Sequence, residues 1–312
     1  MAKGRKISVL GAGSVGATIA YTLAVQGIAS EIVLIDINKK KATGEAADIV
    51  QGASFIPPLK IYSGEYEDAE GSDIVVYTLG IPRKPGMSRI DLVNTNVGIF
   101  KEVIPPTVKH APDAIHVVVS NPVDILTYAV TKISGLPANR VVGSGTLLDT
   151  SRLKAILAER VGVSSDNIDT YVLAEHGDTS FIPWSLSTIF GLDASTYVVK
   201  HFGEKSLNWK EEILDDVRKA GGRVIADKGA TFYAVSLSVC EICWNILQDT
   251  KTLLPVGNVL NGQYGISGVC LSLPFAVGAQ GIVGSFCPEL APGEETALKN
   301  SAEALKAICK NI

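Results

Sequence analysis

Three glycines near the N-terminus have the spacing that dinucleotide binding requires. Gly11, Gly13 and Gly16 form a Gly-x-Gly-x-x-Gly pattern between an apolar run at Ile7–Leu10 and a helical pattern that continues to Gly27. Gly11 permits a tight turn, Gly13 lets the backbone approach a pyrophosphate, and Gly16 lets the helix pack closely on the sheet. The free N–H groups at the helix start attract phosphate oxygens. Glycines with this spacing can also serve turns alone, so the pattern needs support from its surroundings.

An aspartate supplies that support. Asp36 lies twenty residues beyond Gly16, at the end of a second strand-like run at Glu31–Ile35. Its carboxylate can accept hydrogen bonds from a ribose diol and would repel a 2′-phosphate, and no arginine stands nearby to bind that phosphate. The pattern therefore predicts NAD rather than NADP as the cofactor. The predicted contacts are Gly11, Gly13, Ser14, Val15, Gly16 and Asp36.

A histidine in the second half of the chain has neighbours suited to acid–base chemistry. His176 stands in the segment Ala174–Thr179, after a strand-like run at Thr170–Leu173. A single histidine is more often structural than catalytic. Oxidation of a hydroxy acid, however, requires a base for the hydroxyl proton, a cation for the carboxylate and a group that polarises the developing carbonyl. Arginines and aspartates brought close to His176 by the fold would meet these needs.

Composition limits the classes of function. The chain has 312 residues, of which 46% are hydrophobic, and 28 Lys and Arg against 32 Asp and Glu give a net charge of −4. This balance predicts no nucleic-acid or anionic-membrane surface. No apolar signal segment or membrane span is visible, which predicts a cytoplasmic protein. Cys240 and Cys243 lie in a helical apolar pattern without a second pair, so we expect small buried residues and no metal site.

The elements that must position these residues alternate along the first half of the chain. Strand-like runs are followed by helical patterns, which specifies a parallel sheet covered by helices on both faces. Beyond the first two runs, strands are expected at Ile74–Thr78, Ile115–Ser120 and Arg140–Gly143. The expected helices are 39–51, 92–110, 123–134 and 147–161.

After Val161 the pattern becomes mixed. Strand-like pieces at Thr252–Leu260 and Val269–Phe275 are interleaved with long helices near Trp209–Lys228 and Thr231–Leu247. The fold class predicted is α/β, with a Rossmann-type doubly wound parallel sheet and a C-terminal mixed α+β substrate domain. We expect a NAD-binding domain at 1–143 and a catalytic domain at 144–312, because Gly143–Thr146 interrupts the pattern.

Five motifs in one order resemble the lactate/malate dehydrogenase family. Gly-Ala-Gly-Ser-Val-Gly at 11–16 is joined by Arg-Lys-Pro-Gly-Met-Ser-Arg at 83–89 and Asn-Pro-Val-Asp at 121–124. Leu-Asp-Thr-Ser-Arg at 148–152 and Glu-His-Gly-Asp at 175–178 follow. The similarity extends from Ile7 to the C-terminal helix.

The resemblance implies a role for each matching residue. His176 would give its proton to the C2 oxygen of the substrate, and Asp149 would orient the imidazole and raise its pKa. Arg152 would bind the substrate carboxylate bidentately. Arg89 would polarise the carbonyl from a mobile loop. Asn121, which would touch both substrate and cofactor, and Thr231, which would line the pocket floor, complete the set.

The substrate stays open between two 2-oxo acids. Arg83 occupies a lid position that is usually glutamine in lactate dehydrogenases and arginine in malate dehydrogenases, and a lid guanidinium can pair with the second carboxylate of oxaloacetate. Against this, Gly143–Asp149, Lys228–Tyr233 and Leu260–Ile266 resemble bacterial lactate dehydrogenases. We expect L-lactate dehydrogenase, a fermentation enzyme of glycolysis, with L-malate dehydrogenase as the alternative.

The sequence also bears on effector binding, on other classes of NAD-binding protein and on the oligomeric state. Lys154 and Asp169 stand where fructose-1,6-bisphosphate-activated relatives carry arginine and histidine, and an acid there would repel the effector. A non-catalytic NAD sensor would not need the residues around His176. A sugar-nucleotide epimerase would need a Tyr-x-x-x-Lys pair, whose spacing Tyr128 and Lys132 match. The family implies a homo-oligomer, dimer or tetramer.

Overall fold

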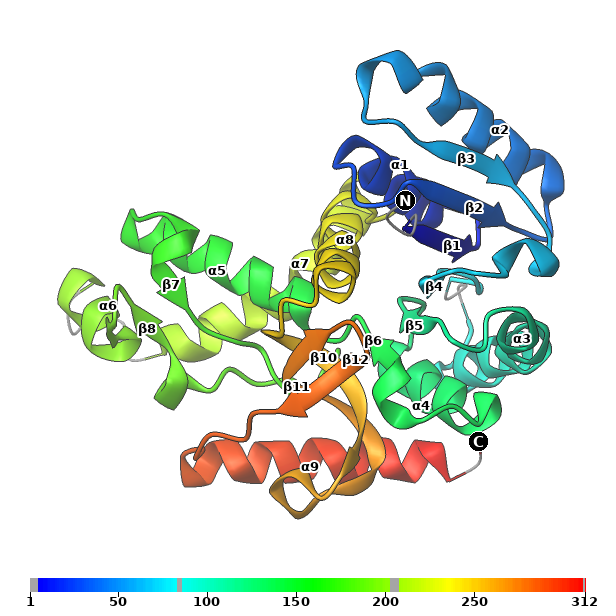
Figure 1. Cartoon of the computed structure of the whole chain (residues 1–312). Helices are drawn as coiled ribbons and strands as arrows, with labels where there is room; N and C mark the ends of the chain where they lie inside the picture. The colour runs from blue at the N-terminus through cyan, green and yellow to red at the C-terminus, as the bar shows by residue number, and fades with distance from the viewer. Residues whose placement is uncertain (1–4, 83–85, 203–207, 311) are drawn as a thin grey trace.

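A nine-stranded sheet forms the centre of the protein. The computed structural model describes residues 5–82, 86–202, 208–310 and 312, so the predicted lid residue Arg83 lies outside the described residues (Figure 1). The strand order is β12-β11-β10-β6-β5-β4-β1-β2-β3. Six strands from the first half pair in parallel, and three strands from the second half extend the sheet in antiparallel pairing.

The parallel part is buried on both faces. Its strands are short apolar runs, as in β4, where all four residues of Ile-Val-Val-Tyr are buried. The strands are β1 (Lys6–Leu10), β2 (Glu31–Ile35), β3 (Lys60–Ser63), β4 (Ile74–Tyr77), β5 (Ile115–Val118) and β6 (Val141–Gly143). The helices between them are α1 (Ser14–Val25), α2 (Lys39–Gln51), α3 (Arg89–His110) and α4 (Val123–Ser134). This confirms the doubly wound α/β class.

The chain direction reverses beside β1, which determines where a ligand can bind. From β1 the chain moves to β2 and β3, and then returns to β4 on the other side of β1. The loops after β1 and β4 therefore separate at the carboxyl edge of the sheet. Open α/β sheets bind ligands in the crevice at this reversal.

The C-terminal strands join the same sheet. Strands β10 (Thr252–Asn261), β11 (Ser267–Gly278) and β12 (Gly281–Ser285) continue from β6 through the pair Gly143 and Gly257. A Cβ on Gly257 would lie 3.5 Å from the Gly143 Cα, so the two glycines permit this close approach. The predicted boundary after residue 143 thus falls within a continuous sheet. Helix α8 (Tyr233–Gln248) packs on α1, and α9 (Pro292–Cys309) packs along β11 (Figure 1).

A second, smaller core lies beside α5 (Leu147–Val161) and α7 (Trp209–Lys228). It includes α6 (Ala194–Phe202) and a three-stranded sheet of β7 (Ile168–Asp169), β8 (Thr188–Ile189) and β9 (Leu192–Asp193). The strand expected at Thr170–Leu173 is wrong, because the backbone N–H of Val172 donates to Thr150 Oγ1 and leaves the ladder. Leu173 makes an isolated bridge with Phe181.

None of the helices in the described part of the chain combines the length and apolarity that crossing a bilayer takes. The described residues also bring together no group of three or more metal-ligating side chains. Cys240 and Cys243 are buried in α8, as expected for small core residues.

Candidate active site

The glycine-rich turn connects β1 to α1 with the geometry that a pyrophosphate needs. Gly11 has a φ of +102°, which favours glycine, and a Cβ on Gly16 would lie 1.8 Å from the Gly11 carbonyl oxygen. A Cβ on Gly13 would meet no atom within 4 Å, so the space above this residue is open. No side chain caps the start of α1. Its first N–H groups are therefore available to phosphate oxygens.

Asp36 is held against this turn. Its Oδ2 accepts a hydrogen bond from the Ala12 N–H at 2.6 Å, and its Oδ1 accepts one from the Asn38 N–H at 2.7 Å. The carboxylate stands at the end of β2, one strand away from the phosphate turn, where a ribose would follow the pyrophosphate. The residues present fit a dinucleotide.

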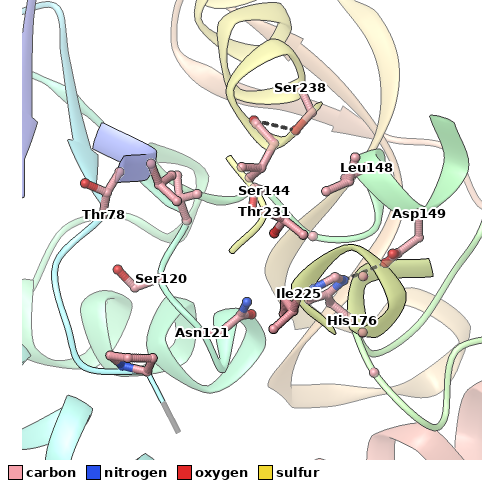
Figure 2. Close-up of a pocket in the computed structure, with 18 of the residues that line it drawn as sticks. Thr78, Ser120, Asn121, Ser144, Leu148, Asp149, His176, Ile225, Thr231 and Ser238 are labelled. Atoms are coloured by element: carbon pink, nitrogen blue, oxygen red, sulfur yellow. Dashed lines mark hydrogen bonds and ion pairs between the residues drawn. The ribbon is translucent and has the colours of Figure 1, made fainter. Parts of the chain in front are cut away.

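A cavity of about 450 Å³ extends from the start of α1 to the loop of His176. This volume falls in the range of small-molecule sites. Among the predicted site residues, those that line it are Val15, Asn121, Asp149, Arg152, His176 and Thr231. Figure 2 shows Asn121, Thr231 and His176 around one space, with Asp149 behind the imidazole. The fold thus brings together side chains from α1, from the ends of β5 and β6, and from the second half of the chain.

His176 and Asp149 form a close polar pair in this cavity. His176 Nδ1 lies 2.5 Å from Asp149 Oδ2, and the Arg152 Nη1 donates to Asp149 Oδ1 at 2.9 Å. Because an ionised carboxylate accepts but does not donate, Nδ1 must carry the proton in this pair. Nε2 is then the ring nitrogen left for a substrate.

Burial and charge act in opposite directions on this pair. Burial alone would lower the pKa of His176, but the charge and hydrogen bond of Asp149 outweigh it and raise the pKa. Burial would raise the pKa of Asp149, yet the charge of His176 and then that of Arg152 hold this pKa below its ordinary value. The pair with Asp149 therefore favours the protonated imidazole.

Arg89 lies beside the cavity but does not line it. It is the first residue of α3, and its guanidinium pairs with the buried carboxylate of Glu175. Its Nη1 also lies 3.9 Å from Asp178 Oδ2. Arg89 is thus next to the loop of His176, but it is not among the residues that line the cavity.

Known proteins match this chain over nearly its full length. The profile of the lactate/malate dehydrogenase NAD-binding domain matches residues 5–143, and that of the family's α/β C-terminal domain matches residues 146–312. The chain belongs to this family. L-lactate dehydrogenase of Clostridium botulinum strain Hall is 48% identical over 306 residues, which cover 98% of this chain and 96% of that protein. L-lactate dehydrogenase 1 of Clostridium acetobutylicum is 47% identical over 312 residues and covers both chains fully.

Solved structures show the same likeness in three dimensions. The minor L-lactate dehydrogenase of Enterococcus mundtii superposes with a TM-score of 0.95 at 37% identity and covers 99% of both chains. The resemblance stated from the five motifs is confirmed. The lactate/malate dehydrogenase fold therefore accounts for the sheet and for the cavity at its edge.

Several lining residues of this lactate/malate dehydrogenase were absent from the predicted set. Thr78, Ser120 and Ser144 follow β4, β5 and β6, and they line the cavity together with Arg218 of α7 (Figure 2 labels the first three). The carboxyl ends of parallel strands meet at one edge, so the three strand-end residues were accessible to sequence reasoning. Arg218 was not, because its place depends on how α7 packs.

The epimerase alternative does not fit the geometry. Lys132 Nζ lies 5.5 Å from the ring centre of Tyr128 on α4, and neither residue is among those that line the cavity. A Tyr–Lys pair in an epimerase must face the nucleotide and sugar, so the matching spacing here is a helical coincidence.

Proposed function

We propose that this chain is an NAD-dependent L-lactate dehydrogenase, which interconverts pyruvate and L-lactate. The observation that carries the proposal is the contact between Asp149 and both His176 and Arg152, because it places an acid–base group beside a carboxylate-binding cation. A protein that merely sensed NAD would have no use for this cluster. The names of the relatives support lactate over malate. We further propose that residues 1–143 form the NAD-binding domain and residues 144–312 the catalytic domain.

Proton transfer belongs to His176. In the reduction of pyruvate, the protonated imidazole donates from Nε2 to the C2 oxygen, and Asp149 stabilises the imidazolium before the transfer. In the reverse direction the neutral imidazole accepts the hydroxyl proton of lactate. NADH, when bound, supplies the hydride that reduces C2.

Binding and orientation belong to the residues around the histidine. Arg152 binds the substrate carboxylate with the guanidinium nitrogens that Asp149 leaves free, and Gly221 gives it room, since a Cβ there would lie 3.3 Å from Arg152 Nη2. Asn121 contacts both substrate and cofactor, and Thr231 lines the floor of the pocket. Gly11, Gly13, Ser14, Val15, Gly16 and Asp36, with Asn121, hold the dinucleotide.

Arg89 must exchange its ion pair with Glu175 for a contact with the substrate. Its guanidinium leaves Glu175 when the substrate binds and then polarises the C2 carbonyl. Its partner in this structure, Glu175, is the residue before His176.

The test compares two substrates in an NADH-oxidation assay. We expect kcat/KM for pyruvate to exceed that for oxaloacetate by at least roughly tenfold, or 1.4 kcal/mol. In Arg83→Gln, pyruvate should react as before, whereas any oxaloacetate activity that uses the lid arginine should fall by roughly 10²–10³. A parent enzyme that prefers oxaloacetate would make it a malate dehydrogenase.

The chain is further proposed to work as a homo-oligomer. Large apolar side chains are exposed along α8, where Tyr233 is 65% exposed, Leu237 55% and Trp244 42%. Such a row on one helix is typical of a protein interface. Light scattering after size-exclusion chromatography should give a mass of at least twice 32.9 kDa.

A further inference from the structure

A second carboxylate, that of Asp124, contacts the main chain of His176. Neither the motifs nor the mechanism above assigns a role to this residue. Asp124 lies in the first turn of α4, three residues after Asn121, and is 4% exposed. Its Oδ2 accepts a hydrogen bond from the backbone N–H of His176 at 2.8 Å. This bond joins the nucleotide side of the cavity to the loop that carries the acid–base group.

The other oxygen of Asp124 is buried without a hydrogen-bond partner among the described residues. A Cβ on Gly257 would lie 3.8 Å from this Oδ1, so the oxygen points towards β10. A purely structural carboxyl group in such a place would be expected to have both oxygens bonded. Among the described residues, the hydrogen bond that Asp124 does make is the one to the main chain of His176.

We propose that Asp124 is a positioning residue for proton transfer, which anchors the main chain of His176 and adds a second negative charge that favours the imidazolium. The inference rests on the proposed function, because the reaction it serves is the proton transfer of pyruvate reduction. Asp149 acts on the ring nitrogen directly, whereas Asp124 acts through the backbone. Asp149 of α5 thus holds the ring and Asp124 of α4 holds the main chain of the same residue, with Nε2 as the ring nitrogen left for the substrate.

The charges around Asp124 support its role as a positioning residue. Burial raises the pKa of Asp124 to about 7, while the charge and N–H of His176 act to lower it. Its ionisation is thereby coupled to that of the histidine. The titratable groups that face Asp124 come from α5, the His176 loop, β11 and α9, and they are Asp149, Glu175, His176, Cys270 and Cys309. Those that act on His176 are Asp124, Asp149 and Arg152.

The direction of the effect follows from the charges. The ionised Asp124 stabilises the imidazolium, so its removal must lower the pKa of His176. The form that reduces pyruvate is the protonated one, so kcat/KM falls as pH rises through this pKa. Without the charge of Asp124 that fall must begin at lower pH.

The experiment measures the titration of His176 by NMR of the full-length protein with NADH bound. The chain has four histidines, so labelling of the imidazole Cε1 gives four signals, and His176→Asn assigns the one of interest. In Asp124→Asn the titration midpoint of His176 should fall by roughly one pH unit, the size expected for loss of a nearby charge. The high-pH limb of kcat/KM for pyruvate should move by the same amount. At low pH, kcat should stay within about threefold of the parent, because the amide oxygen still accepts the His176 N–H.

Two further variants complete the design. Asp124→Leu removes charge and acceptor together, so kcat should fall roughly 10²-fold at every pH from misplacement of the imidazole. Asp113→Asn, whose side chain is 96% exposed, is the matched control and should change nothing. If Asp124→Leu does not fold, the Asn variant alone decides the question.

Several outcomes overturn the inference. An unshifted His176 midpoint in Asp124→Asn would remove the electrostatic role, and full kcat in a folded Asp124→Leu would remove the anchoring role. Failure of the proposed function is seen separately, as a parent protein that does not oxidise NADH with pyruvate while its histidine still titrates.

Discussion

The two halves of the candidate site are built in different ways. The nucleotide turn lies within one segment, Gly11–Asp36, and consists of backbone shape: a positive φ, a close helix contact and open space above Gly13. The proton-transfer site draws Asn121, Asp149 and His176 from three separate segments and depends on buried charge. The nucleotide turn thus depends on the local shape of the backbone, whereas the proton-transfer site depends on charges that the fold brings together.

This difference teaches which changes each half tolerates. In the nucleotide turn a single added carbon atom should strongly reduce stability or NADH binding, while most polar substitutions nearby should change these two properties little. In the proton-transfer site the loss of one charge should change the others, since His176, Asp149 and Arg152 share hydrogen bonds. The predictions below test this contrast, from the largest expected effect to the smallest.

The largest effect is expected at the acid–base group. His176→Asn should lower kcat for pyruvate reduction by roughly 10²–10⁴, the range of general acid–base catalysis. NADH binding, measured by fluorescence titration, should change less than about twofold, because the nucleotide turn is a separate structure. His110→Asn, at the end of α3, serves as the control and should leave kcat unchanged. Near-parental turnover of His176→Asn would mean that another group supplies the proton.

The second test adds one methyl group at two neighbouring glycines. In Gly16→Ala the Cβ would collide with the Gly11 carbonyl oxygen, so the free energy of unfolding should fall by at least about 1–3 kcal/mol. In Gly13→Ala the Cβ enters open space, so the melting temperature should stay the same while the Kd for NADH rises roughly tenfold or more.

The two glycine variants therefore separate a packing role from a ligand role. Calorimetry without ligand and NADH titration together measure both quantities. Equal loss of stability in the two variants would show that the turn has no space reserved for a phosphate.

A smaller effect is expected at the ribose contact. The parent should prefer NADH to NADPH by at least roughly tenfold, and Asp36→Ser should narrow this gap because the repulsion of a 2′-phosphate is removed. Asp48→Ser on the exposed side of α2 is the control. Equal kcat/KM for both cofactors in the parent would contradict the assignment of Asp36.

The smallest effect is expected from a sugar bisphosphate. Lys154 lies on α5 and the exposed Asp169 on β7, and an acid at this position repels phosphate groups. Fructose-1,6-bisphosphate should therefore change the KM for pyruvate by less than about twofold. Strong activation at neutral pH would reveal an effector site made of other residues.

The sequence by itself determined most of the helices and strands, and it predicts the nucleotide half of the site. Helices at Lys39–Gln51, Val123–Ser134, Leu147–Val161 and Trp209–Lys228 have the predicted bounds, because their apolar periodicity and their terminal residues act locally. The turn at Gly11–Gly16 was equally predictable, since its shape depends on adjacent backbone atoms. Motif resemblance then named the residues of the chemical half.

Only the tertiary structure decided how those residues meet. It extends the parallel sheet with β10–β12 across the expected domain boundary, joins Arg89 to Glu175 and aims Asp124 at the main chain of His176. No local pattern encodes these contacts, because each joins segments more than 50 residues apart, as the separations of 52 and 86 residues show. Burial of charge is likewise a property of the assembled fold, since a carboxylate in the unfolded chain is surrounded by water. The raised pKa of His176 and the lowered pKa of Asp149 therefore arise only when the fold brings these two residues together.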